Sequence, residues 1–273
     1  MSRIEQTFAR CRQSGRKALI TFITAGDPEP GVTVPLLHAL VANGADILEL
    51  GVPFSDPMAE GPVIQAACER ALAHNVSLNR VLDMVREFRQ TDSRTPIVLM
   101  GYLNPIEVMG YRRFAQAAAE AGADGVITVD LPPEEGEELN AALIEHGLDP
   151  ILLLAPTSSP ARIRQICDAA RGFVYYVSLK GVTGAASLDI ANVAERVAAI
   201  RAVSKLPIGV GFGISSPEAA ARVAEVADAV VVGSALVRLV AQHQNDSMKI
   251  REAAGAFIAS LRQAMDQSQA AKA

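Results

Sequence analysis

The sequence predicts an α/β fold, a single (β/α)8 barrel preceded by one additional helix. Short apolar runs alternate with longer segments of helical periodicity, which is the pattern of βα units around a parallel sheet. Three units begin with similar phrases, NGADILELG, AGADGVITVD and VADAVVVGS, so the unit is repeated. The length of 273 residues is typical of a TIM barrel. We therefore expect one TIM-barrel domain over residues 1–273, with a disordered tail from about residue 267.

The first segment, residues 1–17, mixes charged and apolar residues without a continuous apolar core. It predicts the extra N-terminal amphipathic helix rather than a signal peptide or a membrane anchor. Apolar runs elsewhere, such as residues 151–155, are far shorter than the ~20 residues that a spanning helix needs. The sequence therefore predicts no membrane partner.

Eight apolar runs are the candidate strands, and a helical segment follows each of them. They are residues 18–23, 46–50, 97–100, 125–129, 150–154, 173–178, 208–211 and 229–232. Continuously apolar runs such as ILLL and VVV are typical of parallel strands that are buried on both faces. An open doubly wound sheet is the alternative. The first strand lacks a GxGxxG turn after it, and eight units in this length favour the closed barrel.

Charge and cysteine content exclude several classes of function. The chain has 25 basic and 30 acidic residues, interspersed along its length, so no field of one sign is available to attract nucleic acid. Three widely spaced cysteines, Cys11, Cys68 and Cys167, fit reduced thiols, and we expect a cytoplasmic enzyme. The 4 histidines have no paired spacing and no acidic cluster around them, so we expect no metal site.

One acidic residue interrupts an apolar strand. In the run ILEL, alternation places Ile47 and Glu49 on one face and Leu48 and Leu50 on the other. If the leucines pack against the helices, Glu49 points into the barrel near the strand ends where such barrels carry their chemistry. Burial would then raise the pKa of its carboxyl towards a value useful for proton transfer. From position alone, a buried ion pair is an equally good interpretation.

The sequence of the loop after this strand favours the catalytic interpretation of Glu49 over a buried ion pair. Residues 49–62, ELGVPFSDPMAEGP, closely resemble the signature of the tryptophan synthase α family. The resemblance continues in FITAGDP (22–28), GYLNP (101–105), VDLPPEE (129–135), SLKGVTGA (178–185), GVGFGIS (209–215) and VVGSA (231–235). It implies a TIM-barrel lyase that splits indole-3-glycerol phosphate into indole and glyceraldehyde 3-phosphate.

The resemblance also implies roles for three polar residues. This retro-aldol reaction needs an acid and a base, and Glu49 would transfer the proton. Glu60 would accept a hydrogen bond from the indole N–H and stabilise positive charge on the ring. Many family members carry the shorter aspartate at this position, and a solvated loop charge is the alternative interpretation of Glu60. Tyr175 would face inward and orient Glu49 or the glycerol chain, with Tyr176 on the opposite face.

Apolar residues near the strand ends would enclose the indole ring. The resemblance selects Phe22, Met100, Ile64 and Ile127, all of which are equally good core residues. The segment 179–188 contains glycines and small residues and predicts a mobile lid over the barrel mouth. The resemblance implies that this lid presents Thr183 to the carboxylates. A plain flexible connection is the alternative.

Glycines after three successive late strands predict a phosphate-binding corner. Gly184 follows the sixth strand, Phe212 and Gly213 follow the seventh, and Gly233 and Ser234 follow the eighth, where a helix should begin. Backbone N–H groups at such positions bind phosphate in this fold.

The resemblance further implies a partner, the β subunit, in an α2β2 heterotetramer. The β subunit would hold pyridoxal phosphate and condense the indole with serine to tryptophan, and this chain would need no cofactor of its own. Two alternatives stay open from the residues: an allosteric subunit with vestigial chemistry, and a barrel enzyme that acts on another phosphorylated metabolite, such as a phosphoribosyl anthranilate derivative. An assay for indole release distinguishes them.

Overall fold

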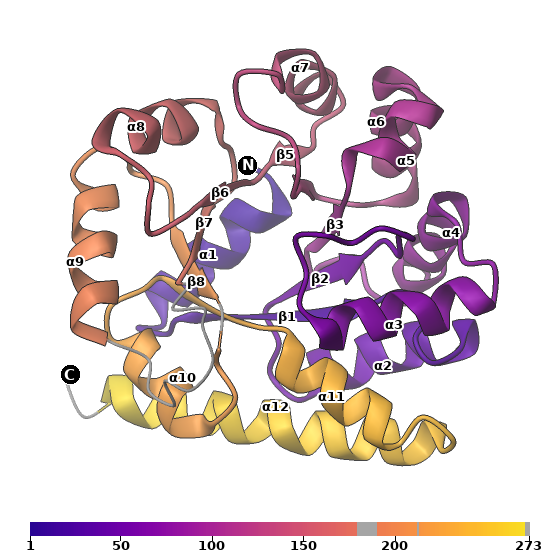
Figure 1. Cartoon of the computed structure of the whole chain (residues 1–273). Coiled ribbons are helices and arrows are strands. Elements are labelled where there is room, and N and C mark those ends of the chain that lie inside the picture. The colour runs from indigo at the N-terminus through magenta and orange to yellow at the C-terminus, as the bar shows by residue number, and fades with distance from the viewer. Residues whose placement is uncertain (179–189, 212, 271–273) are drawn as a thin grey trace.

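The computed structural model describes residues 1–178, 190–211 and 213–270. Its strands form one all-parallel sheet in the order β5-β4-β3-β2-β1-β9-β8-β7-β6, so that the first and last members of the order are neighbours in the chain (Figure 1). The strands are β1 Ala18–Thr24, β2 Ile47–Gly51, β3 Ile97–Gly101, β4 Gly125–Thr128, β5 Asp149–Pro150, β6 Leu152–Leu154, β7 Val174–Val177, β8 Ile208–Gly211 and β9 Ala229–Val232. The predicted (β/α)8 barrel is confirmed.

The fifth predicted strand, residues 150–154, is the one that differs. It is divided into β5, which pairs with β4, and β6, which pairs with β7. Between them, the N–H of Ile151 donates to the carbonyl of Val126 (2.9 Å). Each half is therefore bonded to a different neighbour, which the apolar pattern alone does not reveal.

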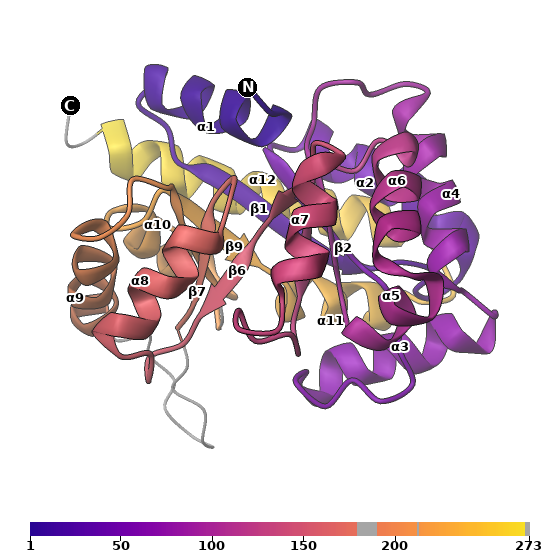
Figure 2. The same cartoon turned by 90° about the horizontal axis from the view of Figure 1, so that it is seen from above.

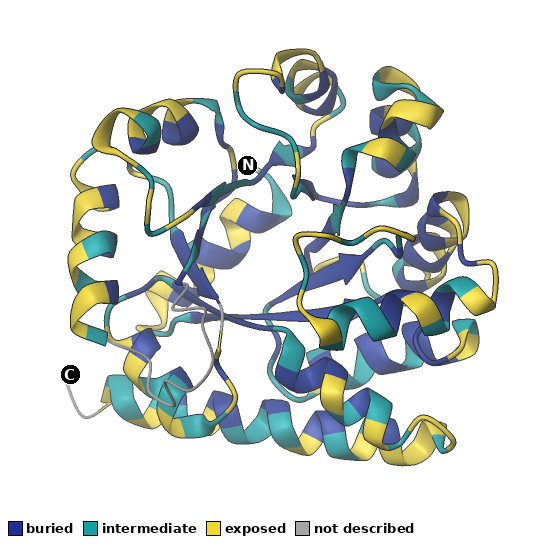
Figure 3. Ribbon diagram, in the orientation of Figure 1, coloured by how far each residue is buried: buried dark blue, intermediate teal, exposed yellow. Residues whose placement is uncertain are grey.

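Helices cover the outside of the sheet. Those of the described residues are α1 Arg3–Gln13, α2 Pro30–Ala42, α3 Pro62–Ala73, α4 Leu78–Arg89, α5 Leu103–Met109, α6 Tyr111–Ala121, α7 Glu137–Glu145, α8 Pro160–Ala169, α9 Ile190–Arg201, α10 Pro217–Ala224, α11 Ser234–Gln242 and α12 Ser247–Ala270. Figure 3 shows the strands almost wholly buried, whereas the helices are buried on one side and exposed on the other. Serine caps followed by proline start α8 and α10, because the serine accepts from the first turn and proline needs no acceptor there.

Two apolar layers follow from the alternation of side chains along the strands. Outward-facing residues such as Leu48 and Leu50 pack with the helices. Inward-facing residues such as Ile47 and Val98 fill the barrel, and they join Phe8 of the predicted N-terminal helix. Helix α1 thereby closes one end of the barrel, and Figure 2 shows it on the side opposite to α3.

The repeated phrase has a structural explanation. Its aspartates, Asp46, Asp124 and Asp228, each stand just before a strand and accept a hydrogen bond from the first residues of a neighbouring strand. Each also pairs with an arginine, and these pairs are Asp46 with Arg262 (3.2 Å), Asp124 with Arg89 (2.8 Å) and Asp228 with Arg201 (2.9 Å). The aspartate thus joins two strands and a helix at the N-terminal end of the barrel.

The C-terminal helix extends beyond the expected limit of order. Residues 267–270 belong to α12. The side chain of Gln269 donates to the carbonyl of Ala224 (3.2 Å), which fastens this end to α10. Residues 271–273 lie outside the described residues.

Candidate active site

Glu49 lies inside the barrel, as strand alternation predicts. Its neighbours in β2, Leu48 and Leu50, belong to the outer layer. The carboxyl is 0% exposed, and neither oxygen has a hydrogen-bond partner among the described residues. Burial, and next the charge of Glu60, raise the pKa of Glu49 to about 8. The buried ion pair that the position alone allowed is not formed with any described residue, and a carboxyl with this pKa is suited to proton transfer near neutral pH.

Glu60 belongs to the loop between β2 and α3 and lines the same cavity as Glu49. Burial raises the pKa of its carboxyl. Its backbone is held on both sides, because its N–H donates to the carbonyl of Pro57 (3.0 Å) and its carbonyl accepts from the side chain of Gln65 (2.8 Å). Two buried carboxyls therefore face one cavity, and the charge of Glu60 disfavours ionisation of Glu49.

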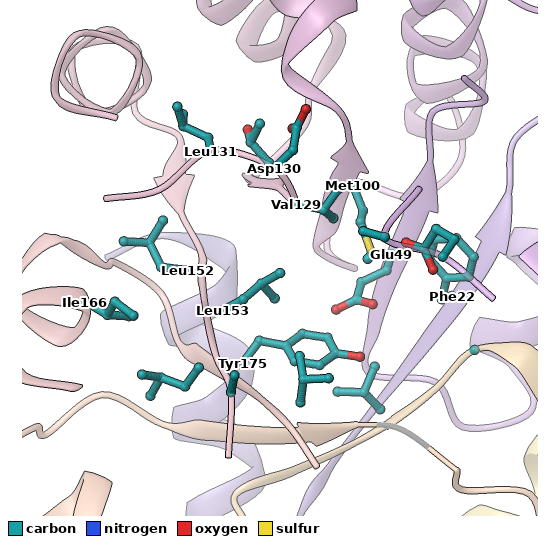
Figure 4. Close-up of a pocket in the computed structure, with 18 of the residues that line it drawn as sticks. Phe22, Glu49, Met100, Val129, Asp130, Leu131, Leu152, Leu153, Ile166 and Tyr175 are labelled. Atoms are coloured by element: carbon teal, nitrogen blue, oxygen red, sulfur yellow. The ribbon is translucent and has the colours of Figure 1, made fainter. Parts of the chain in front are cut away.

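Tyr175 of β7 is the inward member of the tyrosine pair, and Tyr176 packs in the outer layer. Figure 4 shows the hydroxyl of Tyr175 directed towards Glu49. Burial, and then the charges of Glu49 and Glu60, raise the pKa of Tyr175 well above its usual value. A Cβ at Gly211 would collide with the Tyr175 hydroxyl, so a glycine is needed on the adjacent strand.

These groups open into a cavity of about 570 Å³ at the C-terminal ends of the strands (Figure 4). Nine residues expected at the site line it: Phe22, Glu49, Glu60, Ile64, Met100, Tyr175, Gly213, Gly233 and Ser234. Apolar side chains surround the carboxyls, which suits a cavity for an aromatic ring.

Ile127 is not among the lining residues. It is 0% exposed and lies in the apolar interior of the barrel. Val129, two residues further along the same face, lines the cavity instead. The expected residues Thr183, Gly184 and Phe212 lie outside the described residues.

One corner of the cavity is lined by two glycines and the start of a helix. Gly213 has φ +74, a conformation that favours glycine, and Gly233 immediately precedes α11, which begins at Ser234. Gly233 and Ser234 line the cavity, so the first turn of α11 borders it. The first N–H groups of a helix are a common binding site for anions.

The cavity has a second set of lining residues that were not expected at the site, and most of them come from β4, β6, α8 and the loops after β4 and β6. They are Ala59, Thr128, Val129, Asp130, Leu131, Pro132, Pro133, Leu152, Leu153, Leu154, Ala155, Ser158, Arg162, Ile166, Val177, Ile214 and Val231. The segment VDLPPEE carried a signal for part of this set. Nothing in the sequence indicated that the fifth strand is divided and that β6 lines the cavity.

The described part of the chain contains no cluster of histidine, cysteine, aspartate and glutamate side chains that would hold a metal ion. No helix among the described residues is long and apolar enough to cross a membrane.

Comparison with known proteins identifies the family. The family model for the tryptophan synthase alpha chain matches residues 8–266. The tryptophan synthase alpha chain of Thioalkalivibrio sulfidiphilus is 65% identical over 97% of this chain and 100% of its own. The crystal structure of subunit alpha from Legionella pneumophila has a TM-score of 0.92 and 51% identity, covering 98% of this chain and 99% of that one. A tryptophan synthase structure from M. tuberculosis in an aminoacrylate-bound form has a TM-score of 0.85 and 38% identity, covering 96% of this chain and 100% of that one. With this similarity over nearly its whole length and a matching barrel, the chain belongs to the tryptophan synthase alpha chain family.

Proposed function

We propose that this chain, as one TIM-barrel domain, cleaves indole-3-glycerol phosphate into indole and glyceraldehyde 3-phosphate, with Glu49 as its proton-transfer group. Family membership supports the reaction. The observation that carries the role of Glu49 is a fully buried carboxyl, without an ion pair among the described residues and with a pKa of about 8, at the wall of the cavity.

The reaction requires two proton movements. Carbon 3 of the indole ring gains a proton, and the ring nitrogen takes up the resulting positive charge. The neighbouring side-chain hydroxyl then loses its proton, its oxygen forms the aldehyde, and the electrons of the broken carbon–carbon bond return to the ring. Because Glu49 is mostly protonated at neutral pH, it can supply the first proton and then, as a carboxylate, accept the second.

Glu60 is proposed to accept a hydrogen bond from the indole N–H. A carboxylate at that position stabilises the positive charge that develops on the ring nitrogen, so it contributes more to the transition state than to substrate binding. Tyr175 is proposed to orient Glu49 or the glycerol chain, and Phe22, Met100 and Ile64 to contact the ring. What supports these roles is that all of these residues line one cavity.

The phosphate is proposed to bind at Gly213, Gly233 and Ser234, where the start of α11 offers N–H groups and a favourable helix dipole. Gly184 and Phe212 are assigned to the same corner, and Thr183 to a contact with the substrate, from the family resemblance.

The proposed partner is the tryptophan synthase β subunit, in an α2β2 complex in the cytoplasm. It would receive indole from this chain, and its own pyridoxal phosphate would serve the condensation with serine. This chain would need no cofactor. Co-purification with a β subunit tests the partner.

The direct test of the reaction is to incubate the purified chain with indole-3-glycerol phosphate and measure indole. Release of indole is the expected result. Turnover of another phosphorylated metabolite instead would contradict the proposal.

A further inference from the structure

The loop that carries Glu60 is exposed and needs external contacts to hold its position. Ser55, Asp56, Met58 and Ala59 are all exposed, and Met58 is 86% exposed. Within the loop, only short turns connect the backbone, such as the N–H of Met58 to the carbonyl of Asp56 (2.8 Å). A carboxylate must be held to within a fraction of an ångström to act on a substrate atom.

Tyr102 supplies one of these contacts from a different part of the barrel. It lies directly after β3, is only 5% exposed, and its hydroxyl accepts a hydrogen bond from the N–H of Ala59 (2.9 Å). Its ring also stacks on Phe54 of the same loop, with ring centroids 5.2 Å apart. The hydroxyl therefore fixes the residue immediately before Glu60, and the ring fixes the beginning of the loop.

The residue after Tyr102 is joined to another loop of the barrel. The next residue, Leu103, begins α5, and its N–H donates to the carboxylate of Asp130 (2.8 Å) in the loop after β4. Burial first, and then the charge of Glu60, raise the pKa of Tyr102 to about 12 against the opposing effect of the Ala59 hydrogen bond. Tyr102 is thus electrostatically close to Glu60, although it does not line the cavity.

We propose that Tyr102 is a positioning residue for Glu60: its hydroxyl holds the N–H of Ala59 and thereby places the Glu60 carboxylate against the indole N–H. The inference rests on the proposed role of Glu60. It differs from ordinary packing, because it assigns the effect to the oxygen of Tyr102 and not to its ring.

The test compares Tyr102→Phe, which keeps the ring and removes the oxygen, with Tyr111→Phe as a control. Tyr111 also has a hydroxyl whose pKa is raised, first by its interaction with Glu107, but it lies outside the cavity lining. The full-length protein is assayed for indole formation. We expect Tyr102→Phe to lower kcat about 10-fold with little change in KM. Tyr111→Phe should stay within about twofold of the unchanged protein.

The decisive comparison repeats Tyr102→Phe in a Glu60→Ala background, in single turnovers with enzyme in excess so that low rates are measurable. If Tyr102 acts through Glu60, the double variant should react less than about twofold more slowly than Glu60→Ala alone. Amide exchange at Ala59, followed by NMR, should be faster in Tyr102→Phe.

Four results would overturn the proposal. A full 10-fold loss in the Glu60→Ala background would show that Tyr102 acts independently of Glu60. Unchanged kcat or unchanged Ala59 exchange in Tyr102→Phe would show that the hydroxyl holds nothing of consequence. Full activity of Glu60→Ala alone would instead remove the proposed role of Glu60, and this inference would fall with it.

Discussion

The carboxyl of Glu49 is set apart by what surrounds it. Its neighbours across the sheet are Phe22 on β1 and Val98 on β3, so no cation is paired with it there. Alternation in ILEL predicted the direction of this side chain. That Glu49 has no ion-pair partner among the described residues depends on side chains from other strands, which the sequence of one strand does not specify.

The activity should depend on pH through Glu49. Its pKa of about 8 lies above the ordinary 4.5, so the proton needed for the first step is present below about pH 8 and lost above it. We expect kcat/KM for indole formation to fall as the pH rises through about 8. A pH–rate profile measures this, and a value that stays flat between about pH 6 and 9 would contradict the assignment.

The length of the Glu60 side chain gives a second prediction at this scale. Glu60→Asp keeps the acceptor for the indole N–H and should retain much of the activity, whereas Glu60→Ala should lose it by about 10²-fold. Steady-state indole formation by both variants is the measurement. Equal rates for Glu60→Ala and Glu60→Asp would show that Glu60 is only a solvated charge of the loop.

Among the elements, the positions of the strands were easier to predict than the pairing between them. Buried parallel strands are recognisable as apolar runs, and eight of them were found. The pairing of β5 with one neighbour and β6 with another depends on long-range hydrogen bonds, so it left no mark in the apolar pattern. Order in residues 267–270 likewise depends on α12 contacting α10.

The repeated aspartates predict a stability effect that is separate from catalysis. Asp124 is 4% exposed and bonds to Arg89, Arg3 and the N–H of Ile97. Asp124→Ala would leave buried donors without partners, so we expect it to lower the free energy of unfolding by about 3 kcal/mol. Urea denaturation measures this loss.

Asp83→Ala is the matched control for this substitution. It breaks an exposed pair with Arg86, so its cost should be below about 1 kcal/mol. The activity of folded Asp124→Ala protein should be retained, since Asp124 is at the opposite end of the barrel from the cavity. Equal costs for the two substitutions would show that the aspartate contact adds no particular stability.

At the scale of the whole molecule, the barrel separates stability from chemistry. The N-terminal end holds α1 and the aspartate–arginine pairs, and the C-terminal end holds Glu49 and Glu60, the apolar lining of the cavity and the start of α11. The sequence predicted the residues on strands and at helix starts that meet in the cavity. It missed those on the loops after β4 and β6, because loop conformations are set by contacts with distant segments.

The central claim is that Glu49 transfers the proton in a lyase reaction, and Glu49→Gln tests it most directly. Glutamine keeps the shape of the side chain and removes the titratable group. The measurement is indole formation from indole-3-glycerol phosphate by the purified variant, with circular dichroism to establish that it is folded. The account predicts a decrease of at least ~10²-fold in kcat. Turnover close to that of the unchanged protein in a folded Glu49→Gln variant would contradict it.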